Sequence, residues 1–154
     1  MSDPARVLII RLSAVGDVVD TLPALQALRA AFPEAYLAWV VEPKAADILR
    51  GHPDLNEVLV FPRIKFHADG ERKVSHLERF ARSIAHKGRT LPAVLAFFSE
   101  LRRRRFDWAI DFHGNAKSGL VATASGARIR IGMDRSEVRE GNALFTHLRV
   151  PLRG

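Results

Sequence analysis

Short apolar runs alternate with segments of helical periodicity along this chain of 154 residues. Continuous runs rich in β-branched residues indicate strands that are buried on both faces, as in a parallel sheet covered by helices. We expect five such strands, at residues 6–11, 36–41, 58–61, 106–111 and 128–132. Apolar residues at helical spacing predict helices over 17–31, 44–49 and 116–124, and around 77–84 and 94–101. The pattern therefore predicts an α/β fold, a Rossmann-like parallel sheet with helices on both faces.

Two segments interrupt this alternation. Residues 62–74 show no apolar period and contain Asp69-Gly70, which predicts a loop. The last residues, HLRVPLRG, are typical of a segment that leaves a domain.

The first predicted strand leads into a loop that contains Ser13, Gly16 and Asp17. A dinucleotide-binding loop needs three glycines and a P-loop ends in Gly-Lys-Ser/Thr, and neither pattern is present here. Ligands of open α/β sheets bind at the carboxyl ends of the strands, where Asp17 is expected to lie. The loop is therefore poorly suited to phosphate and suited to a general base. The alternative is that Asp17 only begins the helix, a position that favours Asp.

Three blocks of the sequence resemble the heptosyltransferases of glycosyltransferase family 9. The first, VLIIRLSAVGDVVDTLPALQALRAAFP, carries that family's Ser-x-x-Gly-Asp loop and its Thr-x-Pro-Ala-Leu helix. The second, HPDLNEVLVF, has Asn56 where the family usually has Asp. The third, FDWAIDFHGNAKSGLVATASGARIRIGMDRSEVREGNALF, follows in the family's order. Together the blocks extend over nearly the whole chain.

The resemblance implies the N-terminal half of a GT-B glycosyltransferase, an enzyme of two Rossmann-like domains. Residues 1–154 are then a single acceptor-side domain, with the C-terminal donor-binding domain absent. The implied reaction transfers heptose from ADP-heptose to a Kdo-containing lipopolysaccharide core, with inversion and without metal or cofactor. We expect the chain to be inactive alone, and to be cytoplasmic with peripheral contact at the inner face of the cytoplasmic membrane.

The resemblance also assigns the site residues. Asp17 matches the family's catalytic base, and its loop neighbours Ser13 and Gly16 are expected to contact substrate. Ser13 has the alternative of satisfying local backbone, and Thr21 is expected to bond back into its own helix. His113 is expected to be a partly buried polar contact rather than a base. The other predicted substrate-binding residues of the later blocks are Asn115, Lys117, Ser118 and Arg139.

Two of these residues are predicted to bind anions. Lys117, in the first helical turn, is predicted to meet an anion together with backbone amides. Arg139 is predicted to form a bidentate contact with an acceptor carboxylate or phosphate. Its alternative is a surface ion pair with Glu137 or Glu140.

The charge of the chain is unevenly placed. The net charge is +7, and residues 63–105 hold twelve basic residues against four acidic ones, a net of +8. Such asymmetry favours an anionic partner. Arg63 and Lys65 are predicted to grip the phosphates and Kdo carboxylates of the acceptor, with a solvated helix face as the alternative.

The composition of the chain excludes several other classes of site and protein. The absence of cysteine excludes disulfides, thiol catalysis and Cys-based zinc sites. No run approaches the roughly 20 apolar residues of a membrane span. The alternative to the enzyme is a non-enzymatic anion-binding module for nucleic acid or an acidic membrane surface. No aromatic residues alternate with the arginines as in single-strand binders, so no nucleic-acid partner is expected. An unrelated Rossmann-like nucleotide binder is disfavoured by the missing glycines.

Overall fold

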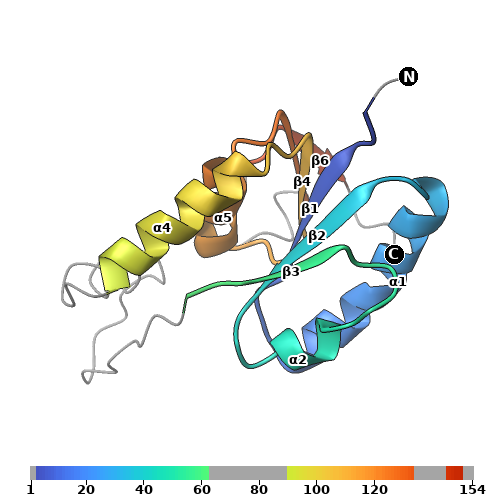
Figure 1. Cartoon of the computed structure of the whole chain (residues 1–154), viewed down its shortest axis with the longest axis horizontal. Coiled ribbons are helices and arrows are strands. Elements are labelled where there is room, and N and C mark those ends of the chain that lie inside the picture. Colours follow the sequence, from blue (N-terminus) through green and yellow to red (C-terminus); the bar gives the residue numbers. More distant parts are fainter. Residues whose placement is uncertain (1–2, 63–89, 134–144, 151–154) are drawn as a thin grey trace.

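The computed structural model describes residues 3–62, 90–133 and 145–150, which form one parallel sheet between two layers of helices (Figure 1). The order of the strands across the sheet is β3-β2-β1-β4-β5-β6, and every neighbouring pair is parallel. The strands are β1 (Arg6–Ile10), β2 (Tyr36–Val41), β3 (Glu57–Val60), β4 (Trp108–Asp111), β5 (Ile129–Met133) and β6 (Leu148–Val150). The helices are α1 (Val15–Ala31), α2 (Ala46–Leu49), α4 (Thr90–Arg103) and α5 (Ala116–Ala124). The predicted Rossmann-like fold is confirmed.

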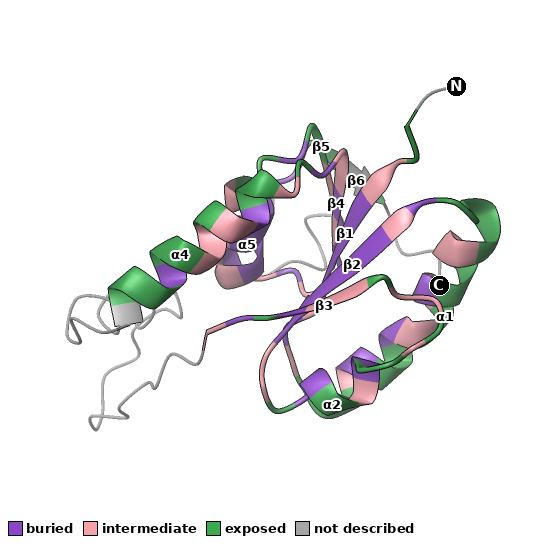
Figure 2. Cartoon of the chain, in the orientation of Figure 1, coloured by how far each residue is buried: buried purple, intermediate pink, exposed green. Residues whose placement is uncertain are grey.

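Among the described helices, α4 and α5 cover one face of the sheet and α1 and α2 cover the other (Figure 1). Alternate residues of a strand point to opposite faces, so Leu8 and Ile10 of β1 pack with α4 and α5. Val7 and Ile9 pack with α1 and α2 on the other face. All four of these side chains are fully buried, and β1 and β2 form the buried centre of the sheet in Figure 2. This double burial explains why the strands have continuous apolar runs instead of alternating ones.

The structure differs from the sequence prediction at the end of the chain. A segment leaving the domain was expected there, but Leu148–Val150 forms β6 and pairs with β5. A three-residue edge strand is too short to show a period, and its Leu148 and Val150 side chains are more than half exposed. The other predicted elements are present with boundaries shifted by a few residues. The helix predicted around 77–84 and most of the loop predicted over 62–74 lie outside the described residues.

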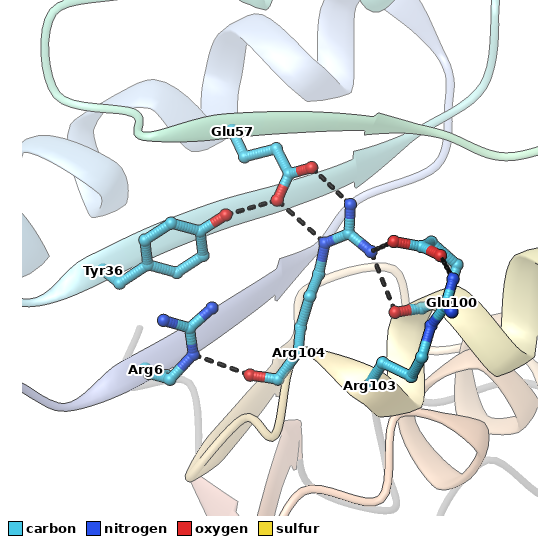
Figure 3. A network of polar contacts seen from close by, with 6 residues as sticks. All are labelled: Arg6, Tyr36, Glu57, Glu100, Arg103 and Arg104. Carbon is cyan, nitrogen blue, oxygen red and sulfur yellow. Dashed lines mark hydrogen bonds and ion pairs between the residues drawn. The ribbon is translucent and has the colours of Figure 1, made fainter.

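A polar network fastens α4 to the sheet at the amino ends of the strands (Figure 3). The Arg104 guanidinium, just after α4, binds both carboxylate oxygens of Glu57, at 2.5 and 2.8 Å. The Tyr36 hydroxyl donates to the same carboxylate, and Arg6 Nε donates to the Arg104 carbonyl at 2.6 Å. The Arg104 side chain is only 17% exposed, so these bonds are partly shielded from water. Arg102 and Arg103, at the end of α4, are exposed, whereas Arg104 joins two layers.

Within the described residues, no helix is long and apolar enough to cross a membrane.

Candidate functional site at the switch point of the sheet

The strand order reverses between β1 and β4, and the two loops that leave these strands lie side by side. Ile10, the last residue of β1, is the register partner of Asp111, the last residue of β4. The chain continues from β1 toward α1 and from β4 toward α5, which cover opposite faces. Open α/β sheets bind ligands at such a reversal, in the region between the two loops, which we term the crevice. The loops that carry the residues predicted from the first and third sequence blocks, apart from Arg139, therefore border this region.

Asp17 stands at the edge of this crevice in the first turn of α1. It occupies the third helical position, and its Oδ2 accepts a hydrogen bond from the Ala14 backbone N–H at 3.1 Å. The same oxygen forms an ion pair with Arg11 at 2.6 Å. The Asp17 side chain is 48% exposed, so a carboxylate is presented to solvent at the carboxyl end of β1. This placement suits a group that takes a proton from a bound substrate.

Arg11 joins the two loops and was not among the predicted site residues. One terminal amino group of its guanidinium donates to the Phe112 carbonyl after β4, while the other reaches Asp17. The side chain is only 18% exposed, and its buried Nε has no hydrogen-bond partner among the residues that the structure describes. The signal that could have identified it is a charged residue placed directly after a buried strand.

The local charges set the protonation states at the crevice. The Ala14 N–H first, and then the Arg11 charge, hold the pKa of Asp17 below its usual value, so the carboxylate is ionised at neutral pH. Burial lowers the pKa of His113, and the neighbouring Arg11 lowers it further. The ring is therefore neutral at neutral pH, and its buried Nδ1 has no hydrogen-bond partner in the described part of the chain.

The start of α5 is held by hydrogen bonds of its own residues. Asn115 caps the helix by accepting from the Ser118 N–H at 2.9 Å, and the Ser118 hydroxyl accepts in return from the Asn115 N–H at 3.1 Å. Ser118 Oγ also donates to Asp111 Oδ2 at 2.8 Å. Asp111 Oδ1 accepts from the backbone of His113 and Gly114. Because Ser118 is fully buried, its predicted contact with substrate has no geometric support, and its observed contacts order the loop after β4.

Lys117 carries a charge that is already paired. Its ammonium group binds the carboxylate of Glu42, just after β2, and lies 4.7 Å from the centre of the Phe61 ring. The side chains of Lys117 and Glu42 are 14% and 30% exposed. A substrate anion at this position would have to compete with Glu42. Glu42 was not predicted, although it too follows a buried strand.

The remaining predicted residues divide into those placed at the crevice and those outside the described part of the chain. Gly16 is exposed, and an added Cβ there would meet no atom within 4 Å. Ser13 is partly buried in the loop between β1 and α1. Thr21 donates to the Asp17 carbonyl at 2.7 Å, which confirms the predicted bond into its own helix. Arg63, Lys65 and Arg139 lie outside the described residues.

No group of three or more His, Asp or Glu side chains suited to a metal ion occurs within residues 3–62, 90–133 and 145–150. The expected independence from metal stays a prediction.

Comparisons with known proteins agree on one family. The family profile described as glycosyltransferase family 9 (heptosyltransferase) matches residues 94–152. The chain is 31% identical over 135 residues to lipopolysaccharide heptosyltransferase 1 of Escherichia coli strain K12, covering 88% of this chain and 38% of that protein. It is 23% identical over 147 residues to the lipopolysaccharide core heptosyltransferase OpsX of Haemophilus influenzae, covering 96% of this chain and 35% of that protein.

A solved structure supports the same relationship. The E. coli heptosyltransferase WaaC with ADP-2-deoxy-2-fluoro heptose superposes with a TM-score of 0.75 at 29% identity, covering 97% of this chain and 43% of that one. The likeness confirms the predicted class, a Rossmann-like domain of a GT-B glycosyltransferase. The chain spans between 35% and 38% of the length of the two relatives named above. None of these similarities supports the alternative of a non-enzymatic anion-binding module.

Proposed function

We propose that this chain, which belongs to glycosyltransferase family 9, supplies the acceptor side and the general base for transfer of heptose from ADP-heptose to a Kdo-containing lipopolysaccharide core. The observation that carries the proposal is the ionised, half-exposed carboxylate of Asp17 at the switch point of the sheet. The similarity to lipopolysaccharide heptosyltransferases and to a structure holding an ADP-heptose analogue supports the donor and the acceptor class.

The proposed chemistry is a single displacement with inversion. The acceptor hydroxyl attacks the anomeric carbon of the heptose, and its proton passes to the Asp17 carboxylate. As the new carbon–oxygen bond forms, the bond from that carbon to the phosphate oxygen breaks and ADP leaves with the electron pair. Asp17 can act in this way because it is ionised and solvent-accessible before the acceptor binds.

The remaining residues are assigned to the acceptor. Gly16 leaves open space beside the helix start, where a sugar ring can approach the backbone. Ser13 and Asn115 border the same crevice, and Lys117 can contribute only where the acceptor displaces Glu42. Arg63, Lys65 and Arg139 are proposed to bind the acceptor's phosphates and carboxylates. Because that acceptor carries a lipid, the reaction is proposed to take place at the cytoplasmic face of the inner membrane.

The first test is transfer itself. The chain alone, mixed with ADP-heptose and a deacylated Kdo-containing acceptor, is expected to release no ADP above background, because the donor is proposed to be held by a second domain. A chimera in which this chain replaces the matching part of the E. coli heptosyltransferase 1 is expected to release ADP and to form the glycosylated acceptor. A folded chimera that binds ADP but transfers nothing to any Kdo-containing acceptor would contradict the proposal.

The second test concerns the acceptor's charge. Reversal of Arg63 and Lys65 to Glu should weaken binding of a phosphorylated Kdo-containing acceptor and make binding less dependent on salt. Reversal of the exposed Arg102 and Arg103, at the amino ends of the strands, provides a control with the same change of charge. Equal loss of affinity in both variants would indicate attraction by net charge instead of a defined contact. Binding of DNA or RNA at physiological salt, without binding of the acceptor, would favour a nucleic-acid module.

A further inference from the structure

We infer that Arg11 is a positioning residue for Asp17: its guanidinium holds one carboxylate oxygen against the loop after β4 and leaves the other oxygen directed to the acceptor. The inference rests on the proposed function, since it takes Asp17 as the base. It adds to that function a residue whose contacts explain how an exposed carboxylate keeps one orientation.

The two carboxylate oxygens of Asp17 differ in their contacts with the protein. Both the Ala14 N–H and the Arg11 guanidinium bind Oδ2 of Asp17, at 3.1 and 2.6 Å. No described residue donates a hydrogen bond to Oδ1. Oδ1, which has no partner among the described residues, is therefore the oxygen available to a substrate hydroxyl, and its direction is fixed through Oδ2.

Arg11 is itself attached to the backbone of the loop after β4. Its second amino group donates to the carbonyl of Phe112, which follows β4 and lies 101 positions further along the chain. The Phe112 N–H in turn donates to the Ile10 carbonyl at 3.0 Å, and the Trp39 indole donates to the Arg11 carbonyl at 3.1 Å. The guanidinium is thus anchored to the backbone on the far side of the crevice. The carboxylate is held relative to both strands that border the switch point.

The two contacts of this side chain suit arginine in particular. A guanidinium is planar and can donate to a carbonyl with one amino group and to a carboxylate with the other. A lysine ammonium supplies the same charge at a single point and does not hold these two acceptors in a fixed geometry. Arg11 therefore has two separable effects on Asp17, one of charge and one of orientation.

Orientation matters because Asp17 is half-exposed in the first turn of a helix. A free carboxylate there would rotate among staggered rotamers, and only some of them would direct an oxygen toward the crevice. Proton transfer in an enzyme depends on a base held within hydrogen-bond reach of the hydroxyl. The Arg11 charge also lowers the pKa of Asp17, which weakens it as a base, so orientation is the benefit that the contact offers.

The test uses the full 154-residue chain, labelled with ¹³C and ¹⁵N. NMR would report the pKa of the Asp17 carboxyl and, from three-bond couplings, the distribution of its χ1 rotamers. The variants are Arg11→Gln, which removes the charge, and Arg11→Lys, which retains the charge and removes the two-point geometry. Arg50→Gln is the control, because Arg50 is exposed and pairs with Asp47, away from the crevice. Asp17→Asn identifies the resonance.

We expect one dominant Asp17 rotamer in the wild-type chain and in Arg50→Gln. In Arg11→Gln the pKa of Asp17 should rise and the rotamers should average. In Arg11→Lys the pKa should stay below that of the Gln variant, while the rotamers still average. A wild-type rotamer distribution in Arg11→Lys would overturn the inference, and this result decides the matter even where Arg11→Gln does not fold.

These measurements involve neither donor nor acceptor. Failure of the chimera to transfer heptose would therefore count against the proposed function and leave the role of Arg11 in orienting Asp17 standing. An unchanged Asp17 rotamer would remove that role and leave Asp17 as the proposed base.

Discussion

Replacement of Asp17 by Asn should separate a role in catalysis from a role in starting α1. Asn has nearly the same shape and retains an oxygen that can accept from the Ala14 N–H. It does not carry the charge that pairs with Arg11, and it does not accept the proton of the acceptor hydroxyl. The two roles therefore predict different results from the same substitution.

The structure sets the expected loss of stability. The ion pair with Arg11 involves an Asp17 side chain that is 48% exposed, and such pairs contribute about 0.2–1 kcal/mol. The interaction of an acidic side chain with the helix N-terminus adds about 0.3–1 kcal/mol. We therefore expect a loss of about 1 kcal/mol, which lowers Tm by roughly 2–4 °C in a domain of this size. Loss of a general base should lower kcat by about 10²–10⁴-fold.

The assay pairs the two measurements. Tm is measured on the chain, and kcat on the chimera that turns over, with protein concentration corrected for the folded fraction. Asp20→Asn is the matched control, because Asp20 lies one turn further along α1, is exposed and has the same side chain. A decrease in kcat of less than about threefold, well below the general-base range, would refute the assignment of Asp17 as base. A large fall in Tm with normal turnover per folded molecule would identify Asp17 as a structural residue.

Three further outcomes follow from the contacts described above. Arg104→Met should destabilise the chain by about 2 kcal/mol in urea unfolding, because the carboxylate of Glu57 loses its charged partner. The same substitution at the neighbouring, exposed Arg103 should lower the free energy of unfolding by less than about 1 kcal/mol. An equal loss in both variants would contradict a stabilising role of the Arg104–Glu57 contact. Burial lowers the pKa of the His113 ring in the folded chain, so the ring of the unfolded chain takes up a proton at a higher pH than the ring of the folded chain. The free energy of unfolding should therefore fall as the pH drops below about 6.5. His113→Gln should reduce this loss of stability between pH 7 and 5. An unchanged dependence of the free energy of unfolding on pH would attribute the loss to other titratable groups. Gly16→Ala should stabilise α1 by about 0.5–1 kcal/mol while weakening acceptor binding, and unchanged affinity in the chimera would exclude Gly16 from the acceptor surface.

The sequence predicted the layers of this fold because their signals are local. A run such as Val7 to Ile10 is apolar at every position, and this indicates a strand covered on both faces wherever the strand lies in the sheet. The edge strand β6 gave no such signal, since three residues with one face in solvent show neither a run nor a period. Its pairing with β5 depends on a neighbour that the local pattern does not specify.

The sequence predicted which loops form the candidate site, but it did not predict the contacts between the side chains of those loops. Asp17 was found because a loop motif places it after the first strand, and the helix start after Asp111 was found in the same way. The contacts that determine what Asp17 can do come from Arg11 and from the Phe112 carbonyl, 101 positions away from each other. They meet only because the strand order places β4 beside β1, and that order results from packing of the whole sheet. Lys117 illustrates the same limit, because the local sequence suggested a cation free to bind substrate, and the sheet brings Glu42 against it from another strand. Motifs thus identify the residues proposed to supply the chemistry, whereas non-local neighbours set the charge state and orientation of these residues. Arg11 and Glu42 are therefore the positions where substitution tests the proposed site most directly.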